Sequence, residues 1–81
     1  MNIKVQLFAE AREFAGALEL EFDLELGSTV LDLKDKLIRD YPQLESLIQR
    51  SSFALNDDYG TDESEITEGT ELAMIPPVSG G

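Results

Sequence analysis

The sequence predicts a single α+β domain in which a mixed sheet of about five strands carries one main helix across one face, with short extra helical turns. Three observations lead to this prediction. Apolar and polar residues alternate over residues 2–9 and 18–26, which is the period of a half-buried strand. Apolar residues recur at helical spacing over residues 30–41. Short apolar runs at residues 53–55 and 71–75 then return the chain to the sheet.

The N-terminal part is expected to form a strand, a short helix and a second strand. Residues 10–15, between the strands, suit a short helical turn because Gly16 stands where a left-handed residue often closes a helix. The second strand is the clearest in the chain, with acidic residues on its solvent face. Its apolar residues are expected to face the core: Leu18, Leu20, Phe22, Leu24 and Leu26.

The main helix is expected over residues 30–41. The Gly-Ser-Thr segment of residues 27–29 breaks the preceding strand and offers an N-cap. Tyr41 precedes Pro42, and this dipeptide ends the helix because a residue before proline avoids the helical region. One further helical turn is indicated by three apolar residues: Leu44, Leu47 and Ile48.

The C-terminal part is expected to add short strands and turns. Residues 53–55 form a short strand, and residues 56–58 read Asn-Asp-Asp, which is a turn signal. Ile66 is expected to anchor the acidic loop that follows. A second turn at Glu68-Gly69 leads into the last strand, residues 71–75.

One core can bury the apolar faces of all these elements. In the last strand we place Leu72 and Met74 inward because they fill volume, which leaves Ala73 and Ile75 outward. The predicted core consists of Ile3, Val5, Leu7, Leu20, Phe22, Leu24, Val30, Leu33, Leu37, Phe53, Leu55, Leu72 and Met74.

Size and composition narrow the possible functions. With 81 residues, 42% of them hydrophobic, we expect one folded domain without room for a deep enzyme pocket. The sequence has no cysteine and no histidine, which removes disulfides, thiol metal sites and the usual general base. A net charge of −11 argues against nucleic acid and anionic membranes; it favours a basic partner, or simply keeps the domain soluble. We find no signal peptide and no membrane-spanning stretch, so we expect a cytoplasmic protein.

Two charged clusters are weak candidates for a site. An acidic group lacks the spacing of a calcium-binding loop, so we expect it to be solvated: Asp57, Asp58, Asp62 and Glu63. A small basic patch on the main helix is bordered by acids, so we expect local salt bridges there. Its basic residues are Lys34, Lys36 and Arg39, and the acids are Asp32, Asp35 and Asp40.

The C-terminal residues are the strongest candidates for function. We predict a domain over residues 1–75 and a flexible tail over residues 76–81, which read Pro-Pro-Val-Ser-Gly-Gly. Pro76 and Pro77 cannot donate backbone hydrogen bonds, so they end the sheet and favour extended geometry. The two terminal glycines have no side chains and suit a narrow channel. Such a tail can reach roughly 20 Å and offer a bare carboxylate for activation by another enzyme; a merely flexible end is the alternative.

Three segments indicate a known family. They are residues 3–16, the segment Phe53-Ala54-Leu55-Asn56, and residues 68–81, which are the most specific because they join a strand to the Pro-Pro-Val-Ser-Gly-Gly ending. With these segments the whole chain resembles the small subunits of molybdopterin synthase, which are ubiquitin-like sulfur carriers of β-grasp fold. It departs from them at Thr70, where aspartate is frequent, and at Gly60, where a β-branched residue is common. The fourth strand is therefore expected to be short.

The resemblance implies a function. In that family the terminal glycine, here Gly81, is adenylated by an ATP-dependent, E1-like activating enzyme and converted to a thiocarboxylate. The sulfur then passes to a pterin precursor in the large synthase subunit, in an assembly of two small and two large subunits. The chain would bind no cofactor and would not be an enzyme on its own. The inserted tail would be Gly80, Ser79, Val78, Pro77 and Pro76, and the outward candidates for docking are Ile75 and Phe8.

Two other functions are compatible with the sequence. A related carrier could serve thiamine thiazole synthesis, tRNA thiolation or amino-acid sulfur supply, because those carriers share the fold and the Gly-Gly end. The Pro-Pro-Val-Ser spacer favours the molybdopterin synthase family over the thiazole carriers, which lack the proline pair. The third possibility is a ubiquitin-like interaction module whose tail is never activated.

Overall fold

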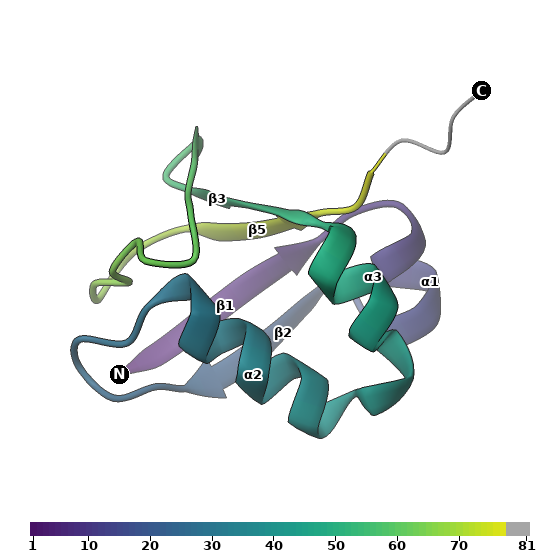
Figure 1. The fold of residues 1–81 in the computed structure, drawn as a ribbon, viewed down its shortest axis with the longest axis horizontal. Helices are drawn as coiled ribbons and strands as arrows, with labels where there is room; N and C mark the ends of the chain where they lie inside the picture. Colours follow the sequence, from purple (N-terminus) through teal and green to yellow (C-terminus); the bar gives the residue numbers. More distant parts are fainter. Residues whose placement is uncertain (78–81) are drawn as a thin grey trace.

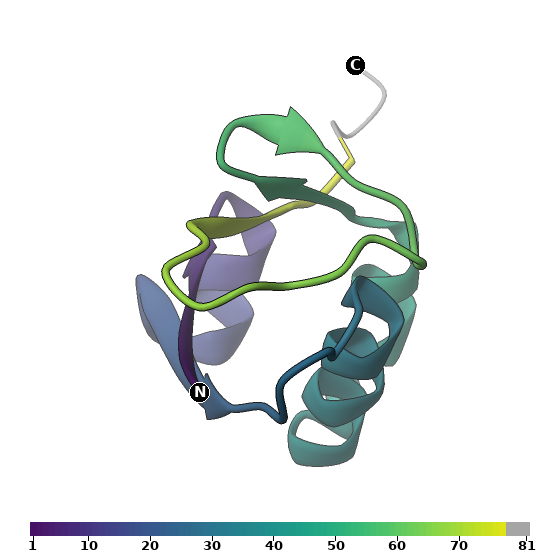
Figure 2. The same cartoon turned by 90° about the vertical axis from the view of Figure 1, so that its left-hand side faces the viewer.

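The computed structural model describes residues 1–77 and contains a five-stranded mixed sheet with the main helix across one face (Figures 1 and 2). The predicted α+β fold is confirmed. In chain order the elements are β1 (Asn2–Leu7), α1 (Glu10–Ala15), β2 (Glu19–Asp23), α2 (Val30–Asp40), a 3-10 turn η1 (Pro42–Leu44), α3 (Glu45–Arg50), β3 (Ser52–Leu55), β4 (Asp58–Tyr59) and β5 (Leu72–Ile75). No helix among these residues is long and apolar enough to span a bilayer.

The strand order places the last strand in the middle of the sheet. The order is β2-β1-β5-β3-β4, so β5 lies between β1 and β3 (Figure 1). It runs parallel to β1, with Leu7 opposite Met74, and antiparallel to β3, with Phe53 opposite Met74. The strand that leads into the C-terminal residues is therefore held by hydrogen bonds on both sides.

The first four backbone N–H groups of a helix have no acceptor within the helix, and at the start of α2 all four have an acceptor elsewhere. Thr29 and Asp32 form a capping box, as the Gly-Ser-Thr break suggested. The loop after β4 supplies the other two acceptors, because its backbone carbonyls face the helix end. The four bonds are Thr29 N to Asp32 Oδ2 (2.9 Å), Val30 N to Ser64 O (3.0 Å), Leu31 N to Asp62 O (3.0 Å) and Asp32 N to Thr29 Oγ1 (3.4 Å).

The core largely follows the predicted pattern, with corrections at the ends of the second strand. Leu18 and Leu26 are 69% and 81% exposed, so their assignment to the core was wrong. β2 covers only residues 19–23. Single backbone bonds still join its flanks to the N-terminal segment, from Leu7 N to Leu18 O and from Leu24 N to Met1 O. Leu20 and Leu55 pack against the core while staying partly exposed. The core cluster also contains residues absent from the prediction: Ala11, Leu44, Leu47, Ile48 and Ile66.

The hairpin between β3 and β4 explains one departure from the family pattern. Asn56 and Asp57 form its turn with φ of 51° and 73°, which these residue types tolerate better than most. As expected, β4 is short, with two residues. A Cβ atom on Gly60 would lie 2.5 Å from Cδ1 of Leu55, so glycine leaves the space that the Leu55 side chain occupies.

Candidate functional site

The base of the predicted tail is firmly attached to the domain. β5 ends at Ile75, as the two prolines suggested. Ile75 is half-buried and Pro76 is buried, whereas Pro77 is exposed, so the chain emerges from the domain at Pro77. The other residues assigned to the tail lie outside the described part of the chain: Val78, Ser79, Gly80 and Gly81.

The sheet has an outer face, opposite α2, that is apolar near the tail and acidic at one edge. Strand register places Gln6, Ala73, Ala54 and Tyr59 in one row across β1, β5, β3 and β4. At the opposite edge, β2 turns acidic side chains to the same face: Glu19, Glu21 and Asp23. The middle of the outer face therefore carries the small apolar side chains of Ala54 and Ala73 between Gln6 and Tyr59, with a negative border at β2.

Phe8 and Ile75 lie at the end of this outer face where the tail begins. They directly follow Leu7 and Met74, which are partners in the parallel pair of β1 and β5. Side-chain alternation along β5 turns Ile75 away from the core. Phe8 lies one residue beyond the end of β1, and its exposure places it at the surface. Phe8 is 38% exposed, and Ile75 is half-buried. The structure thus brings together the two residues predicted for docking, although Ile75 is less exposed than an outward position implied.

A strained turn positions Phe8 relative to α1. Ala9 has φ 50° and ψ −126°, a conformation that is uncommon for a residue with a Cβ atom. The N–H of Ala11 donates to the carbonyl of Phe8 across this turn, at 3.1 Å. The Arg12 Nε–H donates to the carbonyl of Leu7 at 2.7 Å, and the guanidinium carbon lies 5.3 Å from the centroid of the Phe8 ring. Arg12 is a member of this surface that the sequence did not indicate.

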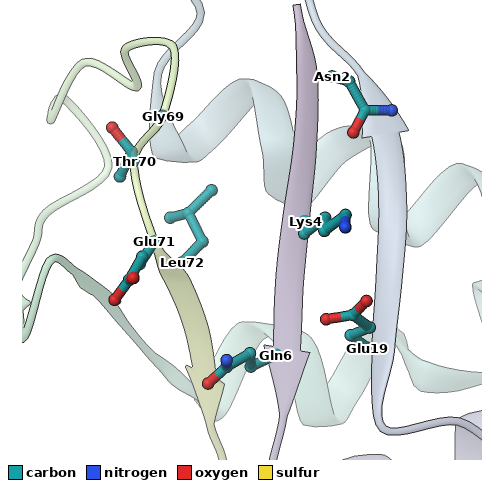
Figure 3. Close-up of a pocket in the computed structure, with 8 residues that line it drawn as sticks. All are labelled: Asn2, Lys4, Gln6, Glu19, Gly69, Thr70, Glu71 and Leu72. Atoms are coloured by element: carbon teal, nitrogen blue, oxygen red, sulfur yellow. The ribbon is translucent and has the colours of Figure 1, made fainter.

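A shallow groove of about 330 Å³ lies on the outer face at the far end of the sheet from the tail (Figure 3). It opens where β1 extends beyond its pairing with β5, between Lys4 and Gln6 on one side and the segment Gly69–Leu72 on the other. Most of the lining residues are polar, although their carbon atoms supply the larger part of the lining surface. Lys4 forms a loose ion pair with Glu21 at 3.8 Å. The groove holds no cluster of catalytic side chains.

The charged clusters differ from expectation in one respect. Lys34 does not pair with an acid on its own helix; its ammonium group lies 2.6 Å from the Asp62 carboxylate in the loop after β4. Lys36 donates to the backbone carbonyl of Asp23, and Asp32 belongs to the capping box. The predicted local salt bridges on α2 were therefore wrong in their partners. Within residues 1–77, no three acidic side chains gather in a way that could hold a metal ion.

Comparison with known proteins adds to this geometry. Residues 5–81 match the ThiS family. The chain belongs to this family. Over its whole length it is 42% identical to the molybdopterin synthase sulfur carrier subunit of Arabidopsis thaliana, of which the match covers 84%. It is also 42% identical to the subunit of that name from Chlamydomonas reinhardtii, over the full length of both chains. The resemblance to the small subunits of molybdopterin synthase that the sequence indicated is confirmed.

A solved structure supports the fold. The crystal structure of SAMP1 from Haloferax volcanii is similar with a TM-score of 0.87 and 30% identity, and the match covers 100% of both chains. The prediction of a ubiquitin-like β-grasp fold is confirmed.

Proposed function

We propose that this chain is the sulfur carrier subunit of a molybdopterin synthase. Its C-terminal glycine, Gly81, carries the sulfur as a thiocarboxylate and donates it to a pterin precursor. The chain is the sulfur-donating subunit of a sulfurtransferase complex and not an enzyme on its own. This agrees with the relatives at 42% identity, which are named as the sulfur carrier subunit of that synthase.

One structural observation carries the proposal. The chain enters its Gly-Gly tail directly from β5, the strand that is bonded on both sides, and Pro76 is buried. A partner that binds the outer face of the sheet therefore also fixes the point from which the tail starts. Such fixed positioning is what a carrier needs if its terminus must enter the active site of another protein.

The chemistry requires only the terminal carboxylate from this chain. An oxygen of the Gly81 carboxylate attacks the α-phosphorus of ATP, and pyrophosphate leaves, which gives an acyl-adenylate. A persulfide of the sulfur donor then adds to the acyl carbon and AMP leaves, which gives an acyl disulfide. A thiol attacks the donor sulfur of this acyl disulfide, so that the thiocarboxylate leaves and the thiol and the donor form a disulfide. This second step suits a chain without cysteine or histidine, because the adenylating enzyme supplies the activating groups.

The thiocarboxylate then acts in the large synthase subunit. Its sulfur forms a bond to a carbon of the pterin precursor as an oxygen substituent leaves that carbon, and water then cleaves the bond between that sulfur and the acyl carbon, which restores the Gly81 carboxylate. A second thiocarboxylated chain supplies the other sulfur in the same way. Phe8 and Ile75 contact the large subunit while residues 76–81 enter it. We propose a cytoplasmic assembly of two small and two large subunits.

The intact mass of the full-length chain tests this function. The chain is incubated with ATP, a sulfur source and an extract of its own host, and the expected result is a mass gain of one sulfur minus one oxygen on Gly81. The matched control is a chain that lacks Gly81, which should keep its fold and gain no mass. An unchanged mass of the complete chain, with the activating enzyme shown to be active, contradicts the proposal and favours a passive interaction module.

A reaction with the large synthase subunit tests which pathway receives the sulfur. The thiocarboxylated chain, mixed with the large synthase subunit and the pterin precursor, should form one molybdopterin for every two thiocarboxylates consumed, because the dithiolene contains two sulfur atoms and each chain carries one. If the thiocarboxylate forms but the large subunit neither binds it nor consumes it, the chain is a sulfur carrier for another pathway, such as thiazole synthesis or tRNA thiolation.

A further inference from the structure

Arg12 is a fixed positive charge at the end of the outer face where the tail begins. Two contacts hold its side chain: Nε–H donates to the carbonyl of Leu7 at 2.7 Å, and the guanidinium lies over the ring of Phe8. These contacts use one of the five N–H donors of the guanidinium. Within residues 1–77 the two terminal nitrogens donate no hydrogen bond, and the guanidinium carbon lies 5.3 Å from the centroid of the ring.

Among the basic residues of residues 1–77, Arg12 alone combines an aromatic ring contact with the lack of a carboxylate partner. Lys36 and Arg50 also lack a carboxylate, but they donate to backbone carbonyls and contact no ring. Lys4 and Lys34 pair with carboxylates of the chain, and Arg12 has no carboxylate within 4.0 Å in that range even though the chain carries 17 acidic residues. Arg39, on α2, also lacks a paired carboxylate there, but no hydrogen bond or aromatic ring fixes it. Arg12 is thus a positioned cation, and Arg39 is a loosely held one.

We propose, resting on the function above, that Arg12 binds a carboxylate of the large synthase subunit and sets the register in which the two subunits dock. The partner surface that meets Phe8 and Ile75 then carries an aspartate or glutamate among apolar side chains. This acidic group would stand out on the partner surface. The acidic border of β2 favours basic groups on the rest of the partner surface that covers the sheet.

The apolar surroundings make this charge selective. When the partner covers Phe8, water is removed from around Arg12, and a desolvated guanidinium without an anion is strongly unfavourable. A partner that places its carboxylate there regains the lost hydration through a two-pronged contact to the terminal nitrogens. A partner without it is rejected, which gives specificity among the enzymes that handle similar carriers.

The experiment measures binding of full-length variants to the purified large subunit. Arg12→Glu and Arg39→Glu change the net charge equally, so their comparison separates a local contact from general attraction. We expect Arg12→Glu to raise the Kd by about 100-fold or more and Arg39→Glu to change it by less than about threefold. Arg12→Lys keeps the charge but loses the planar fork, so we expect about a tenfold rise.

A second measurement separates docking from folding. Arg12 also supports the end of β1, so the melting temperature of each free variant is recorded. Aspartates and glutamates on the large subunit are then changed singly to arginine, and one of these changes should restore binding to Arg12→Glu. A purely structural role of Arg12 predicts no such restoration.

Four outcomes overturn the proposal. The first is wild-type binding by Arg12→Glu, and the second is equal loss in Arg12→Glu and Arg39→Glu. The third is a loss of thiocarboxylate formation with unchanged binding to the large subunit, which assigns the carboxylate to the activating enzyme instead. In the fourth, the wild-type chain does not bind the large subunit; this defeats the proposed function and the role of Arg12 together, before any variant is compared.

Discussion

The ammonium group of Lys34 lies 2.6 Å from Oδ1 of Asp62 and joins α2 to the loop that caps the same helix. The two residues are 28 positions apart in the sequence. Asp62 acts twice, because its backbone carbonyl accepts the N–H of Leu31 while its carboxylate accepts from Lys34. The ammonium group also lies 5.6 Å from the centroid of the Phe53 ring, at the rim of the core.

Replacement of Asp62 by alanine should therefore lower the free energy of unfolding by about 1 kcal/mol, since the carboxylate is partly exposed and the backbone cap remains. Urea denaturation measures this loss. Lys4→Met is the control, because it removes only the looser, exposed pair with Glu21 and should cost close to nothing. A cost of Asp62→Ala no larger than that of Lys4→Met would show that the contact does not stabilise the loop.

Ala9→Gly should stabilise the protein. Ala9 holds φ 50°, where a Cβ atom is strained and glycine is not. We expect a gain of about 0.5–1 kcal/mol in urea denaturation, the relief of strain exceeding the greater freedom of glycine in the unfolded chain. Ala15→Gly, at the end of α1, is the control and should destabilise, because glycine is a poor helix former. Destabilisation by both changes would argue against strain at Ala9.

Phe22→Ala should be among the most damaging single substitutions. Phe22 is 5% exposed on the core side of β2, and its truncation leaves a cavity that should cost about 3–5 kcal/mol. Phe14 is 61% exposed on α1, so the same substitution there should cost less than about 1 kcal/mol. Thermal or urea unfolding of the pair measures the difference, and similar costs at the two positions would contradict the assigned burial.

Gly80→Val should leave the fold intact and abolish transfer. The substitution lies beyond the described residues, so the stability of the domain should change by less than about 0.5 kcal/mol. A β-branched side chain next to Gly81 should clash in a channel built for glycine, which lowers the thiocarboxylate yield or its use by the large subunit. Mass spectrometry of the treated chain reads the first step and molybdopterin formation the second. Equal yields in both steps would refute a narrow channel.

Much of the fold could be predicted because the apolar residues of the strands and of the main helix recur with the period of each element. The same periodicity failed at Leu18 and Leu26. Alternation tells which face a residue would occupy if the strand continued, but it does not tell where the strand stops. The parallel pairing of β1 with β5 is a long-range contact, and local pattern alone does not specify such a pair.

One part of the candidate site could be predicted from the sequence and another part could not. The tail could be recognised because its residues are contiguous and their order is unusual. Arg12 could not, because its contacts with Leu7 and Phe8 depend on the turn at Ala9, and alanine gives no sign of a positive φ. Likewise, the partner of Lys34 lies in a distant loop, whereas helical spacing suggested its neighbours on α2.

The central position of β5 has a mechanical consequence. A pull on Pro77 along the strand axis loads the ladders to β1 and β3 at the same time, so their hydrogen bonds resist together in shear and do not break one after another from an edge. An edge strand at the same place would peel away from the sheet under a smaller force. A partner can therefore grip and stretch the terminal residues of this carrier, and the domain transmits the load without coming apart.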